Sequence, residues 1–122
     1  MGLDMWIRNQ DGNTDGEIYL RSAQQVFDYI ENYIINTKQE GIENCEEYKL
    51  PRILLEKLLW ICHKINKDNS LADKLLPEDY GFGFNTQYEE GYYIQIEELE
   101  KELYRLLNER KGDKYFYFEA WW

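Results

Sequence analysis

Residues 115–122, with the sequence YFYFEAWW, constrain the fold of this chain more than any other segment. Successive side chains of a β-strand point to opposite faces of the sheet, so this segment would carry aromatic rings on both faces. Rings on both faces are buried only when the strand has neighbours or a covering layer. We therefore expect this segment to be a strand that lies centrally in a sheet or beneath a helix.

Three other segments repeat apolar residues at the spacing of an amphipathic α-helix. The first is predicted to begin at Ser22, because Gln25 follows at the position that completes a capping box. The second begins at Pro51, which suits a first helical turn, and its wide apolar arc over residues 53–65 is typical of a central helix. The third is predicted to begin near Tyr93 and to bury a stripe of isoleucine and leucine.

Strand patterns surround these helices. Residues 3–8, LDMWIR, alternate apolar and polar side chains, and the turn-rich residues 9–16 could close a hairpin onto residues 17–20. Residues 17–20 could equally lead into the first helix. A short extended piece is expected at residues 45–50, because the residue before a proline is excluded from helical geometry. The predicted architecture is α+β, with a small, mostly antiparallel sheet, three main helices packed on it, and a single domain over residues 1–122.

The segment LLPEDYGFGFNTQYEEGYY, residues 75–93, combines aromatic, glycine and acidic residues. Tyr80, Phe82 and Phe84 alternate with two glycines, which predicts a further strand with three rings on one face and a bare opposite face. A packed helix or a ligand could approach that bare face closely. The segment lacks the lysine and hydroxyl residues of a phosphate-binding loop, so its glycines are expected to serve packing in the sheet.

The chain is strongly acidic, with 24 acidic and 14 basic side chains and a formal net charge of −10. A field of this sign repels phosphate backbones, so we expect no direct binding to nucleic acid. The same field attracts basic proteins and speeds their capture. An acidic surface can also serve solubility alone.

The sequence contains no run of 18 apolar residues, so we expect no contact with a membrane. The first residues, MGLDMWIRNQDG, lack the basic and apolar regions of a signal peptide. Cys45 and Cys62 do not form a C-x-x-C motif, which favours reduced thiols and a cytoplasmic location.

No catalytic or metal-binding motif stands out, and we expect no cofactor. His63 is the single histidine, and its neighbour Cys62 would point in a different direction on a helix. Carboxylates could support acid–base or metal-assisted chemistry, but their spacing fits no metal-binding loop, which favours solvated loop carboxylates. The candidates of this kind are Asp4, Glu78, Asp79, Glu89 and Glu90.

Four motifs occur in a specific order: MGLDMW at the start, EIYLRSA before the first helix, NCEEY before the central helix, and LLPEDYGFGFNTQYEEGYY. In this order the sequence resembles a group of small phage and prophage proteins that begin MGLDMYL and carry N-C…Y and LLP-x-x-G-F-F-F-G elements. The similarity extends from Gly2 to about Leu103 and departs at Trp6 and Gly83, where that group has a tyrosine and an aromatic residue. The resemblance implies an accessory protein of a phage or mobile element in a bacterial cytoplasm. It carries over no catalytic residue.

These observations favour a protein that binds a host protein with a basic surface. Its carboxylates would stand in for phosphates and its tyrosines for bases, as in an anti-CRISPR or other anti-defence inhibitor, because rings and carboxylates together bind Arg and Lys. The residues expected to contact the partner are Tyr80, Tyr88, Glu89, Glu90, Tyr92, Glu97, Glu98, Glu43, Glu46 and Glu47.

Two alternatives remain open. The first is a structural or homo-oligomeric subunit, for example a homodimer formed through residues 115–122. The second, which the sequence favours least, is a small enzyme with a pocket lined by Asp4, Tyr80, Tyr88 and Glu89.

Overall fold

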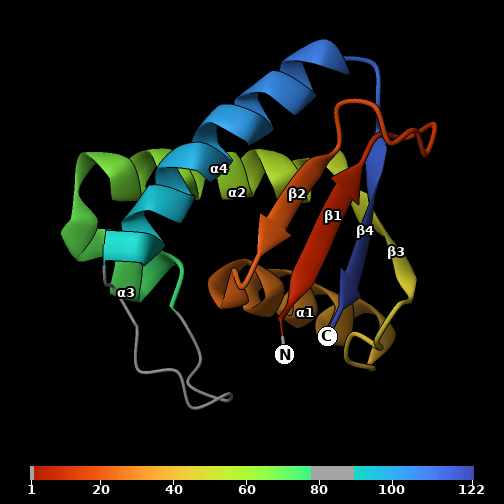
Figure 1. Ribbon diagram of the computed structural model, residues 1–122, viewed down its shortest axis with the longest axis horizontal. Helices are drawn as coiled ribbons and strands as arrows, with labels where there is room; N and C mark the ends of the chain where they lie inside the picture. Colours follow the sequence, from red (N-terminus) through yellow and green to blue (C-terminus); the bar gives the residue numbers. More distant parts are fainter. Residues whose placement is uncertain (1, 78–89) are drawn as a thin grey trace.

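The computed structural model describes residues 2–77 and 90–122, and it confirms the α+β class. A four-stranded antiparallel sheet carries helices behind one of its faces (Figure 1). In chain order the elements are β1 (Asp4–Arg8), β2 (Ile18–Arg21), α1 (Gln24–Lys38), β3 (Glu47–Pro51), α2 (Arg52–Lys67), the short 3-10 turn η1 (Asn69–Leu71), α3 (Ala72–Leu75), α4 (Glu90–Glu109) and β4 (Tyr115–Trp121).

The strand order is β2-β1-β4-β3, and each pair of neighbours is antiparallel. The prediction of a central C-terminal strand is therefore confirmed, since β4 lies between β1 and β3. Of the two alternatives for residues 17–20, the structure shows the hairpin, and Gly12 and Gly16 in its connection both adopt positive φ angles. The extended piece predicted at residues 45–50 forms β3. The glycine-aromatic strand predicted around Phe82 lies outside the described residues.

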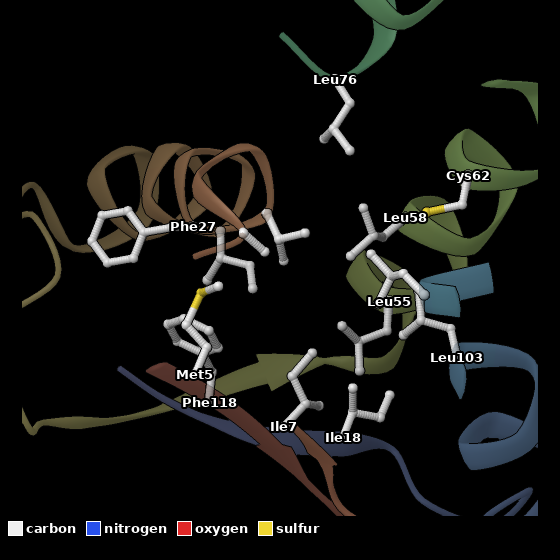
Figure 2. Packing of buried hydrophobic residues seen from close by; sticks show 14 of the residues in the cluster. Met5, Ile7, Ile18, Phe27, Leu55, Leu58, Cys62, Leu76, Leu103 and Phe118 are labelled. Atoms are coloured by element: carbon white, nitrogen blue, oxygen red, sulfur yellow. The ribbon is translucent and has the colours of Figure 1, made fainter. Parts of the chain in front are cut away.

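One face of the sheet forms the floor of the hydrophobic core. Met5, Ile7, Phe116 and Phe118 are fully buried, and they alternate along β1 and β4 with side chains on the other face. Figure 2 shows Met5, Ile7 and Phe118 pointing from the sheet toward apolar side chains of the helices. The alternation thus divides the sheet into a core face and an outer face.

The start of α1 differs from the prediction that Ser22 caps it. The helix begins at Gln24 with Ala23 at the cap position, and no side chain caps it. Ser22 has a φ angle of +56°, and its backbone N–H donates to the carbonyl oxygen of Leu3 at 2.6 Å. The pairing of this segment with the start of β1 therefore prevails over the local capping preference.

Helices α2 and α4 pack on each other, and an arginine joins the start of one to the end of the other. The stripe predicted for α4 is buried. In α2 the arc predicted over residues 53–65 is buried only in part, because Ile53 and Trp60 are exposed. The guanidinium of Arg52 donates to three backbone oxygens, those of Leu107 (2.9 Å), Arg110 (2.7 Å) and Asp113 (3.1 Å). A cation at this position also offsets the partial negative charge at the C-terminal end of α4.

Candidate functional site

The outer face of the sheet carries five aromatic side chains, which we call the aromatic face: Trp6, Tyr19, Tyr115, Tyr117 and Trp121. No described helix covers them, because α1 and α2 lie behind the sheet and α4 packs on α2 and beside β2 (Figure 1). Tyr19 and Trp121 are 52% and 50% exposed. Exposed Trp and Tyr rings that gather on one face are typical of a binding surface.

Contacts between neighbouring strands and within β4 hold the rings of this face. The ring centroid of Trp6 lies 5.6 Å from that of Tyr19 and 6.0 Å from that of Trp121. The hydroxyl of Tyr19 donates to Oδ1 of Asp4 at 2.6 Å, and this hydrogen bond raises the pKa of Tyr19. Tyr115 and Tyr117 meet edge to face at 5.6 Å. The rings are held before any partner arrives, so little side-chain entropy remains to be lost on binding.

Two salt bridges made by one arginine lie in the middle of the aromatic face. Arg8 donates to Glu17 at 2.7 Å and to Glu119 at 2.8 Å. The hydrogen bond from Arg8 lowers the pKa of Glu119, and the indole N–H of Trp121 also donates to this carboxylate. Trp121 is therefore anchored through Glu119 to β1, which gives the surface a fixed shape.

Four carboxylates lie in the connection between α1 and β3 and at the start of β3, and we call them the acidic segment: Glu40, Glu43, Glu46 and Glu47. The loop that carries them is tied to the end of β4, because Asn44 exchanges hydrogen bonds with the backbone of Trp122 and the N–H of Cys45 donates to Ala120. Glu47 stands opposite Glu119 in the register of β3 and β4, so it shares the outer face. Among the described residues, no basic side chain forms an ion pair with any of these four carboxylates.

The structure corrects the predicted contact surface at Tyr92, which is not on the surface. Tyr92 is 4% exposed, and its hydroxyl donates to the carbonyl oxygen of Leu76 at 2.7 Å. Ile96 lies one turn after Tyr92 on the same apolar stripe of α4, and both side chains belong to the core. Tyr92 therefore joins α4 to the end of the α3 segment.

The other predicted contact residues do not form one patch. Glu43 and Glu46 lie in the loop that is tied to the end of β4, and Glu47 begins β3, whereas Glu97 and Glu98 are exposed on the N-terminal half of α4. In Figure 1 that half of α4 lies at the left of the molecule and β3 at the right. Glu90 is the first residue of α4, and the predicted contacts that lie outside the described residues are Tyr80, Tyr88 and Glu89.

The aromatic face itself was not among the predicted contact residues. Its signal is present in the sequence, because Trp6 alternates with the apolar residues of β1 and Tyr117 with those of β4. Alternation shows which side chains share a face of the sheet. It does not show which face the helices cover, and that information comes from the tertiary structure.

A second cluster of polar side chains joins α2 to α4. Nδ1 of His63 lies 2.9 Å from one carboxylate oxygen of Glu100, and Asn66 donates to the other at 2.6 Å. Burial alone would raise the pKa of Glu100, but the hydrogen bonds from Asn66 and His63 outweigh it and the pKa is lowered. A hollow of about 350 Å³ lies beside this cluster and is lined partly by Lys101 and Tyr104.

Four described carboxylates have a lowered pKa, which favours their ionised form. Each described carboxylate with a shifted pKa has it lowered, and these are Asp68, Glu100, Asp113 and Glu119. Asp4, expected to line a pocket in the enzyme alternative, accepts a hydrogen bond from Tyr19 of the aromatic face, and the other predicted pocket residues lie outside the described residues. The described residues contain no group of three or more side chains that could hold a metal ion.

Comparison of the chain with protein-family models, with curated proteins and with solved structures finds no match. In the described part of the chain, no helix has the length and apolar character that are needed to cross a bilayer. The candidate site is accordingly defined by its geometry, as an aromatic face held by ring contacts, with Glu47 on the same face and the rest of the acidic segment in a loop tied to the end of the sheet.

Proposed function

We propose that this chain acts by binding a protein with a basic surface, and that the aromatic face and the acidic segment form the contact. The observation that carries this proposal is the continuity of the two features. Ring contacts hold the Trp and Tyr side chains on the outer face, and hydrogen bonds join the loop of the acidic segment to the end of the same sheet.

The chemistry of this surface suits arginine and lysine side chains. Aromatic faces attract cations, and carboxylates form charge-assisted hydrogen bonds with them. The chain already shows this behaviour with its own residues. Nζ of Lys49 lies 3.8 Å from the ring centroid of Tyr115, and the guanidinium of Arg8 lies 5.9 Å from that of Trp6. A partner's basic side chains would make the same contacts at Trp121 and Tyr19, where the rings are exposed.

In its concrete form, the proposal is a phage-type accessory protein that occupies the nucleic-acid groove of a host protein in the bacterial cytoplasm. The carboxylates of the acidic segment would take the place of phosphates, and the rings of the aromatic face would take the place of bases. The net charge of −10 and the resemblance to phage and prophage proteins support this form. An anti-CRISPR or other anti-defence inhibitor belongs to this class.

The test is capture of proteins from bacterial lysate on immobilised protein, with a matched pair of tryptophan variants. Trp121→Ala removes an exposed ring from the aromatic face, whereas Trp60→Ala removes a ring of similar exposure, 52%, from α2. We expect the wild type and Trp60→Ala to retain the same basic protein at low salt, and Trp121→Ala to lose it. Retention should weaken in about 1 M salt, where the Debye length falls to about 3 Å. Equal capture by both variants, or capture that is indifferent to salt, would contradict the proposal.

The inhibitory form has its own test on the captured partner. Purified protein should displace a nucleic-acid probe from that partner, and a triple variant in which Glu43, Glu46 and Glu47 become glutamine should displace it less well. If the partner binds the chain and the probe together, the two sites are separate and mimicry of nucleic acid is the wrong mechanism.

A further inference from the structure

The two edges of the sheet differ in how they are covered. At the β2 edge, α4 supplies hydrogen bonds to backbone oxygens at both ends of the strand, from Gln95 to Arg21 and from Arg105 to Gly16, each at 2.9 Å. At the β3 edge, no described element lies beyond the strand (Figure 1). A strand edge with free N–H and C=O groups is a template for pairing with another chain.

The register shows which backbone groups of β3 are free. Tyr48 pairs with Phe118, and the N–H of Arg52 donates to the carbonyl of Lys114, which continues the same ladder. Along an antiparallel strand, alternate residues direct both of their backbone groups to the same neighbour. Residues at even positions of β3 therefore pair with β4, and Glu47 and Lys49 direct their N–H and C=O groups to the open edge.

We propose that the β3 edge binds a second copy of this chain, with the two β3 strands antiparallel about a two-fold axis at Tyr48. In this register Glu47 of each copy stands opposite Lys49 of the other. Both members of each pair are edge-facing, so each pair can exchange two backbone hydrogen bonds, as antiparallel pairing requires. The same surface is used on both copies, which is the isologous contact of a closed dimer.

Charge complementarity is the observation that selects a second copy as the occupant. Glu47 and Lys49 lie two positions apart, so their side chains share the outer face, and neither forms an ion pair with a described residue. Glu47 also faces the like charge of Glu119 across β3 and β4. Pairing about Tyr48 gives each of these charges an opposite partner, and it sets the two Tyr48 side chains across from each other on the core side.

Proline does not obstruct this contact. Pro51 lacks an N–H, but in the proposed register it pairs beyond the start of the other strand, where no donor is needed. The contact differs from the dimer through residues 115–122 that the sequence left open, because both edges of β4 are already paired with β1 and β3 and only its side chains could contact another copy. The proposed dimer does not depend on the proposed function. In this dimer the two aromatic faces lie on the same side of a continuous sheet.

Sedimentation equilibrium over a concentration series tests the proposal with a charge-reversal pair. The wild type should dimerise below about 1 mM, a concentration at which even a weak dimer becomes populated. Glu47→Lys and Lys49→Glu should each weaken the dimer about ten- to thirty-fold, because two attractive pairs become repulsive. An equimolar mixture of the two variants should restore it, because each lysine then faces a glutamate.

A backbone variant separates strand pairing from charge alone. Lys49→Pro removes an N–H at the open edge without removing a hydrogen bond to β4, and it should lower dimerisation more than Lys49→Ala does. Circular dichroism of each variant shows that it is folded. A wild type that stays monomeric over the whole series, or variants that fail to associate when mixed, would overturn the proposal.

Discussion

Replacing Arg52 with methionine should destabilise the protein substantially, because this side chain connects the first turn of α2 to the end of α4. Its guanidinium donates to three backbone oxygens, those of Leu107, Arg110 and Asp113, at 2.7 to 3.1 Å. Methionine keeps much of the apolar stem and removes all three donors. The three backbone oxygens lose the guanidinium as a donor, although that of Arg110 still accepts the backbone N–H of Asp113.

The size of the effect follows from the number and exposure of these bonds. Hydrogen bonds to a charged group contribute about 1.5–3 kcal/mol each when buried. The side chain of Arg52 is 22% exposed, so water can replace part of each bond and about 1 kcal/mol apiece is the better figure. We therefore expect the free energy of unfolding to fall by about 3 kcal/mol. For a chain of this size, that loss lowers Tm by about 12 °C.

Urea unfolding followed by circular dichroism measures this loss, and two variants control for other causes. Arg52→Lys keeps the charge but offers no fork of donors, so it should lose about 2 kcal/mol. Glu56→Ala removes the ion pair that Arg52 makes on the surface of α2, at 3.2 Å, and should cost less than about 1 kcal/mol. If Arg52→Met costs no more than Glu56→Ala, the carbonyl contacts do not stabilise the fold and the reasoning is wrong.

Three further predictions concern buried and charged groups. Tyr92→Phe leaves the carbonyl of Leu76 without its buried donor and should cost about 1–3 kcal/mol in urea unfolding. Burial, assisted by a nearby carboxylate charge, raises the pKa of the Cys62 thiol to about 12, so a thiol reagent at pH 8 should label Cys45 and leave Cys62 intact until the protein unfolds. The lowered pKa of Glu119 in the folded state stabilises the protein. This stabilisation is complete above the ordinary carboxyl pKa of about 4.3, and it is lost as pH falls through the lower pKa of the folded state. The urea midpoint of the wild type should therefore drop more steeply below about pH 4 than that of Glu119→Gln.

Each of these predictions has a simple control. Tyr104→Phe changes an exposed hydroxyl on α4 and should be nearly neutral, so an equal loss in both tyrosine variants would argue against a role for the buried hydrogen bond. Labelling of Cys62 at the rate of Cys45 in the native protein would show that the core opens readily. If Glu119→Gln retains the full acid sensitivity of the wild type, the pairing of Glu119 with Arg8 contributes nothing to it.

Much of the fold could be predicted from the sequence because burial follows simple periodicities. The alternation in DMWIR and YFYFEAWW correctly predicted two strands and the central place of the second. The leucine and isoleucine stripe of α4 correctly predicted its buried face, whereas the arc predicted for α2 was too wide, since Ile53 is exposed. These patterns succeed because each one reports a side chain's direction relative to a single element.

The remaining features depend on contacts between elements, which periodicity does not encode. Ser22 has the sequence of a helix cap, but the sheet edge fixes its backbone in another conformation. Tyr92 was expected on the surface because of its acidic neighbours, although its position in the stripe of Ile96 indicated burial. The outer face of the sheet could be listed from alternation, but its freedom from a covering helix could not.

The central position of β4 has a consequence for the biosynthesis of this chain. Arg8 and Glu119, which pair across β1 and β4, are 111 positions apart, so the middle of the sheet closes only when translation has passed residue 121. Until then β1 has only the four-residue β2 beside it, and β3 has no strand neighbour among the described elements. A ribosome that stops early therefore releases a chain with open strand edges, which is a substrate for proteases and chaperones. The folded protein therefore accumulates only when the ribosome has translated the last strand.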